Sequence, residues 1–237
     1  MAKFFGKQSN YLFNKDVKYY LYAAILALLP LAALYFIFRN SSSLMKSPWI
    51  YSGIMLVFIF IVKQVIEPLM DSHQKKSGRY FRGWTGELSI QQELRKLPDT
   101  YSVFPDIKLN KNTGNIDFVV VGPTGVFALE VKSHSGNINY RDGELVNNGR
   151  PFEKDFLRQA KGAALQIHDF LQDRLRAEIF VKPVLVFSGY AKMSIGLRPL
   201  NGVYVLQKQW LARLFENQTT YQYPLALEKL EEALKTV

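Results

Sequence analysis

No cysteine occurs in the 237-residue sequence, which excludes disulfide bonds, thiolate metal ligands and cysteine nucleophiles. Histidine is scarce, and the three histidines have no mutual spacing that indicates a metal site. Glycine-rich nucleotide-binding loops are missing as well, because the Gly-Pro-Thr-Gly segment at 122–125 lacks the lysine and the length of a phosphate loop. Carboxylates and lysines are therefore the residues in which to look for chemistry.

Acidic residues are outnumbered, with 20 Asp and Glu against 30 Lys and Arg and a formal net charge of +10. Such a surplus favours an anionic partner, either nucleic acid or the head groups of a lipid bilayer. Part of the surplus flanks the two most apolar segments, where lipid explains it. The net charge alone is therefore weak support for a nucleic-acid partner.

Two apolar segments predict a transmembrane hairpin. Residues 19–38 carry no charge, and at about 1.5 Å per residue a helix of this length covers roughly 30 Å, the thickness of a hydrocarbon core. Residues 49–66 form the second span, in which Lys63 reaches the interface with its long side chain. A hairpin buried in a soluble core is the alternative, whereas a signal peptide would be shorter.

The distribution of Lys and Arg predicts the orientation of this hairpin. Basic residues precede the first span and follow the second, and the connecting loop has fewer of them, namely Arg39 and Lys46. By the positive-inside rule, both termini lie in the cytoplasm. The sequence thus predicts a multi-pass protein of the cell membrane with a cytoplasmic segment at 1–18, a hairpin at 19–66, a juxtamembrane linker at 67–83 and one cytoplasmic domain at 84–237.

The domain at 84–237 has the pattern of an α/β fold. A helix is expected from about 85 to 96, with Thr85 as its N-cap, and strands at 103–109, 115–121 and 125–132. A Gly- and Asn-rich excursion at 135–149 comes next. A long helix at 154–176, strands at 184–187 and 203–206, and helices at 209–215 and 225–235 complete the domain. This order predicts a mixed β-sheet flanked by helices.

The most informative residues lie on the hairpin formed by the second and third of these strands. If Gly122 pairs with Gly125 across the turn, the residue numbers of every opposed pair add up to 247. Asp117 would then face Glu130, with Cβ atoms roughly 4.5–5.5 Å apart. Two carboxylates so placed repel each other and require a cation or a raised pKa.

Lys132 shares a strand face with Glu130, because alternate residues of a strand point the same way. Two acids and one ammonium group would then converge. Carboxylates suit Mg²⁺ or Mn²⁺, and the lysine could hold a phosphate or orient an attacking water. These are the parts needed for metal-assisted hydrolysis of a phosphodiester.

Two further polar residues interrupt apolar helix faces. Glu87 shares a face with Ile90 and Leu94, and Gln159 lies among Phe156 and Ala163 on the long helix. Each could complete a polar site, although an exposed first-turn acid and a satisfied edge residue are the simpler interpretations. Basic residues on the long helix could contact a nucleic-acid backbone, although a solvated face is the more ordinary explanation; these are Arg158, Lys161, Arg174 and Arg176.

In this order, the sequence resembles the nuclease-related domain (NERD), a family similar to the PD-(D/E)xK nuclease superfamily. The matching segments are Gly-Glu at 86–87, the hairpin at 116–132 with its Gly-Pro-Thr-Gly turn, and Gln-Ala at 159–160. The resemblance implies a restriction-endonuclease-like fold. Ile116 stands where the name of the superfamily places proline.

The resemblance also implies roles for individual residues. Asp117 and Glu130 would bind Mg²⁺ or Mn²⁺, with Glu87 as an additional acid and third ligand. Lys132 would position water or bind phosphate, and Gln159 would orient these groups. The function expected is therefore a membrane-anchored, divalent-metal-dependent nuclease acting on DNA or RNA. The alternative is a non-catalytic module that binds nucleic acid or protein at the membrane, because fold and site can persist without cleavage.

Overall fold

The structure, a computed structural model, describes residues 1–6, 67–109 and 114–237, with scattered positions between 17 and 64. It divides the chain into one unit of residues 1–9 and 85–237 and a second of residues 10–84. No helix formed by the described residues is long and apolar enough to cross a membrane. The predicted spans at 19–38 and 49–66 lie largely outside these residues, so the transmembrane hairpin stays a prediction.

The helix α3 runs from Glu67 to Arg95, so the predicted helix start near Thr85 is wrong, and residues 67–83, predicted to be a juxtamembrane linker, are helical. Pro68 stands in the first turn of α3, where its missing N–H is not needed by the helix. Gly78 costs a helix interior only about 1 kcal/mol, which good helix formers around it offset. Proline and glycine therefore do not interrupt α3.

A six-stranded mixed sheet forms the centre of the domain, as the sequence predicts. Its order is β1-β2-β3-β4-β8-β10, in which β3 is antiparallel to β2 and β4, and the other neighbours are parallel. The strands are β1 (Lys3–Phe4), β2 (Ser102–Ile107), β3 (Ile116–Gly122), β4 (Gly125–Lys132), β8 (Val181–Phe187) and β10 (Tyr204–Gln207). β1 was not expected from the sequence.

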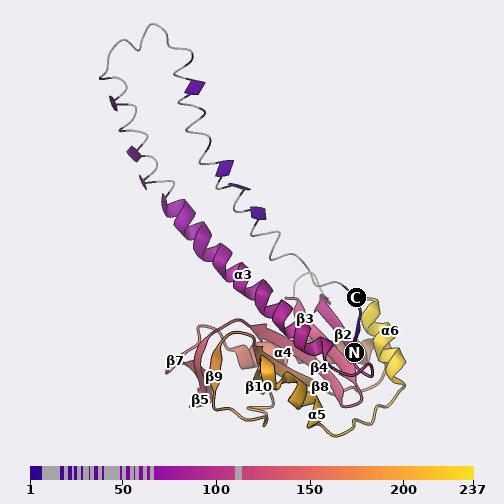
Figure 1. The fold of residues 1–237 in the computed structure, drawn as a ribbon. Coiled ribbons are helices and arrows are strands. Elements are labelled where there is room, and N and C mark those ends of the chain that lie inside the picture. The colour runs from indigo at the N-terminus through magenta and orange to yellow at the C-terminus, as the bar shows by residue number, and fades with distance from the viewer. Residues whose placement is uncertain are drawn as a thin grey trace. The chain divides into compact units, whose positions relative to one another are not determined.

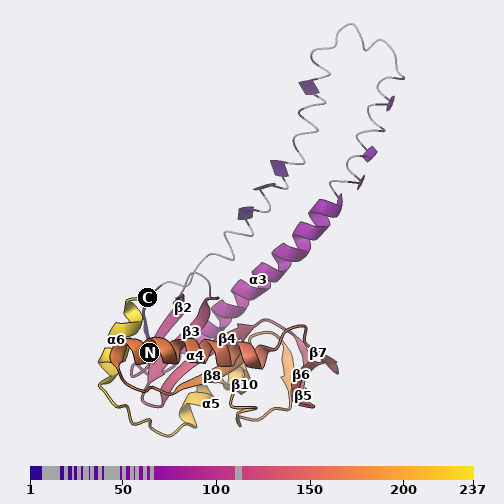
Figure 2. The same cartoon turned by 180° about the vertical axis from the view of Figure 1, so that it is seen from behind.

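Helices cover both faces of this sheet. The end of α3 and α5 (Leu211–Glu216) pack on one face with Phe118 and Phe127. On the other face, α4 (Phe156–Leu175) and α6 (Leu227–Lys235) pack with Val119 and Ala128. Figure 2 shows α4 running across the front of the sheet. The parallel pair β4 and β8 is joined through α4, the usual crossover between parallel strands.

A second, four-stranded sheet contains most of the Gly- and Asn-rich excursion. Its order is β7 (Arg150–Pro151), β6 (Glu144–Asn147), β5 (Gly136–Arg141) and β9 (Ala191–Met193). Ile138 and Leu145 of this sheet pack with Phe156 at the start of α4. The excursion is thus a folded wall beside the first turns of α4.

The N-terminal residues are tied to the domain. The backbone N–H of Lys3 donates a hydrogen bond of 2.9 Å to the carbonyl of Tyr101, just before β2, and that of Phe5 donates one of 2.9 Å to the carbonyl of Val103 in β2. The ammonium of Lys235 lies 4.1 Å from the centre of the Phe5 ring. The two chain ends therefore lie close together (Figure 1).

Candidate active site

The β3–β4 hairpin has the register that the sequence predicts, as far as the ladder extends. Opposed pairs run from Gly122–Gly125 at the turn to Phe118–Leu129. Gly125 has a φ of +126°, a conformation that glycine adopts without strain. The tight turn thus fixes which side chains meet along the hairpin.

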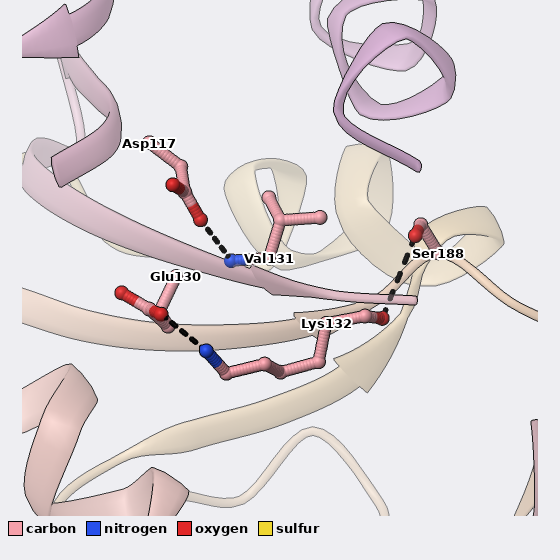
Figure 3. Close-up of polar contacts among 5 residues, drawn as sticks. All are labelled: Asp117, Glu130, Val131, Lys132 and Ser188. Atoms are coloured by element: carbon pink, nitrogen blue, oxygen red, sulfur yellow. Dashed lines mark hydrogen bonds and ion pairs between the residues drawn. The ribbon is translucent and has the colours of Figure 1, made fainter. Parts of the chain in front are cut away.

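The ladder ends one pair before Asp117 and Glu130, so the predicted pair is not part of it. Instead, the Asp117 carboxylate accepts a hydrogen bond of 2.6 Å from the backbone N–H of Val131 (Figure 3). A side-chain oxygen therefore takes the place that a backbone carbonyl of β3 would have in a continued ladder. This contact holds Asp117 at the point where β3 and β4 separate.

A break in strand alternation explains the separation. Residues three apart in a strand normally point to opposite faces, yet Ile116 and Val119 pack in the same core cluster. Phe104 and Ile107 of β2 do the same, and Asp106 between them has a φ of +54°. Both strands thus break the alternation at neighbouring positions, Asp106 and Asp117, while the β2–β3 register stays the same on either side.

Glu130 and Lys132 share one face of β4, as predicted, and this face is turned toward α4. Their side chains form an ion pair of 2.5 Å (Figure 3), with Glu130 6% exposed and the Lys132 side chain 17% exposed. The Lys132 ammonium also lies 4.8 Å from the centre of the Phe156 ring on α4. These two contacts hold the lysine charge beside the carboxylate.

Glu87 comes near this group because α3 approaches the strand ends closely at Gly86. A Cβ atom at Gly86 would lie 2.4 Å from Ser188 Oγ and 3.3 Å from Ser133 Cβ, too close for any larger residue without a shift. Ser133 and Ser188 directly follow β4 and β8. The predicted Gly-Glu pair thus has a physical role: the glycine allows the contact, and the half-buried acid follows it.

Electrostatics link the three acids. Burial raises the pKa of Asp117 well above 3.8, and the nearby charges of Glu130 and Glu87 raise it further. The Val131 N–H and the Lys132 ammonium lower that pKa but do not cancel the rise. Negative charge is therefore concentrated at this end of the hairpin beyond what Lys132 neutralises.

Gln159 is not part of the buried face on which the sequence placed it. Its side chain is exposed, because the period of 3.6 residues centres the buried face of α4 on Ala160, Ala163 and Ile167. In its place, the structure adds two groups that the sequence did not indicate: the Val131 N–H and the Phe156 ring. The Phe156 ring could have been anticipated, because an aromatic residue stands at the start of the helix that follows the Glu-x-Lys strand.

A divalent cation at this site would also need ligands from outside the protein. Within residues 1–6, 67–109 and 114–237, and at the scattered described positions, no group of three or more His, Asp or Glu side chains is arranged to hold a metal ion. The predicted ligand set of Asp117, Glu130 and Glu87 therefore stays a prediction. Two carboxylates with excess negative charge nevertheless suit Mg²⁺, which commonly keeps several waters and binds substrate phosphates.

A comparison with known families covers the part of the chain that contains these residues. An uncharacterized protein of Bacillus anthracis is 34% identical over 85 residues, which cover 34% of this chain and 40% of that protein. This chain thus spans less than half the length of that relative. No solved structure matches this chain. The model of the nuclease-related domain matches residues 82–188, from α3 to the end of β8. Residues 82–188, which contain every candidate site residue, are therefore similar to the nuclease-related domain.

Proposed function

We propose that this protein is a divalent-metal-dependent nuclease that hydrolyses phosphodiester bonds of DNA or RNA. The observation that supports this most is the convergence of acids on Asp117, beside an ion-paired lysine, within the region similar to a nuclease-related domain. Asp117 and Glu130 would hold Mg²⁺ or Mn²⁺, with Glu87 nearby as a further acid. Such an ion would neutralise charge on the scissile phosphate and supply a nucleophilic water.

The chain's own residues have separable tasks in this proposal. The Val131 N–H fixes the orientation of the Asp117 carboxylate, because the 2.6 Å hydrogen bond leaves one oxygen of that group for a second partner. Lys132, packed on the Phe156 ring, would bind a phosphate oxygen or orient the attacking water. Its ammonium can exchange Glu130 for a phosphate without moving far, since both groups accept the same donors.

A cleavage assay with the full chain, purified in mild detergent, tests the proposal. Labelled single- and double-stranded DNA and RNA would be incubated with Mg²⁺, Mn²⁺ or EDTA. The Asp117→Asn/Glu130→Gln variant should lose cleavage by about a hundredfold or more. The control Asp173→Asn/Glu178→Gln changes the same charges at exposed positions and should cleave like the wild type. Metal-dependent cleavage that persists in the first variant would refute the assigned site.

A non-catalytic binding module is the second candidate, and one observation favours it. Glu130 already has Lys132 at 2.5 Å, so a metal must compete with an internal cation for this carboxylate. Binding of an oligonucleotide that weakens steeply with salt, without turnover under any metal, would support this candidate.

We also propose that residues 19–66 anchor the protein in the cell membrane as a hairpin of two spans. β1 supports this, because residues 3–4 pair with β2 of the same domain that begins at residue 85. The chain must therefore leave and return on one side of the bilayer, which two spans achieve and one does not. By the positive-inside rule this side is the cytoplasm.

The lack of cysteine makes this topology directly testable. A single cysteine at Ser42, in the predicted loop, should react with a membrane-impermeant maleimide on intact cells. A cysteine at Ser135, which is exposed in the domain, should react only after permeabilisation. The reverse labelling would overturn the orientation, and equal labelling of both would overturn the anchor.

A further inference from the structure

A pocket lies beside the candidate active site, at the beginning of α4. Its volume is about 380 Å³, which is within the range of ligand pockets. The first turns of α4 form one wall, and the β5–β6 turn and the loop at Asn201 form the others. The Gly- and Asn-rich excursion, which had no role in the sequence analysis, thus shapes a cavity.

Three cations line this pocket: Lys154, Arg158 and Lys161. All three are exposed, and both ion pairs found in the described part of the chain involve other lysines. Of the two acids in the lining, Asp155 caps α4 by accepting a 2.9 Å hydrogen bond from the Arg158 N–H, whereas Glu144 lies on the opposite wall. The pocket is therefore basic along its α4 side.

The pocket and the active site share aromatic walls. Phe156 lines the pocket and also carries the Lys132 ammonium at 4.8 Å. Phe152 lines the pocket too, and the His134 ring contacts both phenylalanines at 5.3 Å between ring centres. The Phe156 ring therefore connects Lys132 with the pocket that the three cations line.

We propose that this pocket binds a backbone phosphate of the nucleic-acid strand next to the bond that is cleaved. The proposal rests on the proposed function, since it makes the pocket a substrate subsite. Phosphates repeat along a strand, so a strand held at Lys132 presents further phosphates to neighbouring cations. Contacts of this kind position the substrate without reading its sequence. The pocket therefore sets affinity and register, not base specificity.

Fluorescence anisotropy with labelled 30-nucleotide DNA and RNA strands tests this subsite. It uses the full chain in mild detergent and EDTA, so that no cleavage occurs. Arg158→Ala/Lys161→Ala should weaken binding about equally for all sequences and reduce the salt slope by about 1 for each cation removed. Arg158→Lys should retain most of the affinity. Arg174→Ala, on the same helix but outside the pocket lining, should bind like the wild type.

The outcomes separate the subsite from the nuclease function. Unchanged affinity and salt slope in the double variant would overturn the subsite, whatever the wild type cleaves. An equal loss in Arg174→Ala would also overturn it, because the effect would then come from overall charge. Inorganic phosphate that binds the pocket at millimolar concentration without displacing the strand would also overturn the subsite, because the pocket would then be an anion site unrelated to substrate. Pocket-dependent binding by a protein that never cleaves would support the subsite and refute the nuclease.

Discussion

The two ends of the β3–β4 hairpin have opposite chemistry. At the turn, polar groups of the hairpin form hydrogen bonds with neutral groups and with one lysine, Lys182. The Tyr223 hydroxyl donates to the Gly122 carbonyl at 2.7 Å, and Tyr101 and Thr124 share a hydrogen bond of 3.0 Å. The Lys182 ammonium donates to the Thr124 carbonyl at 3.0 Å and to Gln218 at 2.8 Å. This end ties the C-terminal segment to the sheet.

At the open end, like charges are brought together instead. Asp117 lies within electrostatic range of Glu130 and Glu87, and its pKa rises as a result of burial and these charges. Such an arrangement costs stability unless a ligand relieves it. The comparison teaches that one hairpin can hold a structural end and a strained end, and that the strained end marks the candidate site.

Substitution of one lysine at each end of the hairpin tests this comparison most directly. Lys132 and Lys182 each lie about 5 Å from an aromatic ring, at opposite ends of the hairpin. Lys132→Ala should reduce cleavage by about a hundredfold, because it removes a charge aimed at the phosphate. Lys182→Ala should leave the cleavage rate unchanged and lower stability by about 1 kcal/mol through lost hydrogen bonds. Rates and urea unfolding of both variants measure this, and equal effects on cleavage would erase the distinction.

A pair of glycines sharpens the comparison at the level of packing. Gly86→Ala should destabilise the protein by about 1–3 kcal/mol and reduce cleavage, because the new methyl group collides with Ser188 and moves Glu87. Gly162→Ala, on α4 with open space around its Cβ position, should instead stabilise by about 0.5–1 kcal/mol. Urea unfolding decides the sign at each position. A stabilised Gly86→Ala protein would show that α3 does not need this close approach.

The smallest expected effect is a pH dependence at the open end. Folding raises the pKa of Asp117, so the folded state binds more protons than the unfolded state above pH 3.8. The contribution of protonated Asp117 to the free energy of unfolding is therefore fully present below pH 3.8 and is lost as the pH rises from 3.8 through the raised pKa. Asp117→Asn should melt at a higher temperature than the wild type near neutral pH in EDTA, and the difference should vanish in acid. A lower melting temperature for Asp117→Asn than for the wild type at neutral pH would contradict the cost assigned to the buried Asp117 charge.

The hairpin was predictable because its determinants are local. The Gly-Pro-Thr-Gly turn sets the register, and the period of two places Glu130 and Lys132 on one face, which the ion pair confirms. The mixed sheet followed from the order of the helices and strands. The approach of Glu87 to Asp117 could be anticipated only through a family resemblance, since α3 and β3 are distant in sequence.

Other features depend on contacts that no local pattern encodes. The end of the ladder at Asp117 reflects a break shared with β2, where Asp106 adopts a positive φ. Gln159 was predicted on the buried face of α4 because it borders the apolar residues of that face, but its position on the helix leaves it exposed. The start of the first helix was predicted too late in the sequence, because Pro68 is tolerated in the first turn of α3 and does not interrupt it.

The two-residue strand β1 has a practical consequence for anyone who removes residues 1–84 to obtain a soluble fragment. β1 covers the outer edge of β2, and without it that edge would expose unpaired N–H and C=O groups. Bare edges recruit other strands, so such a fragment should aggregate. Joining residues 1–6 to residue 85 through a flexible Gly/Ser linker would keep the edge covered while removing the apolar segments.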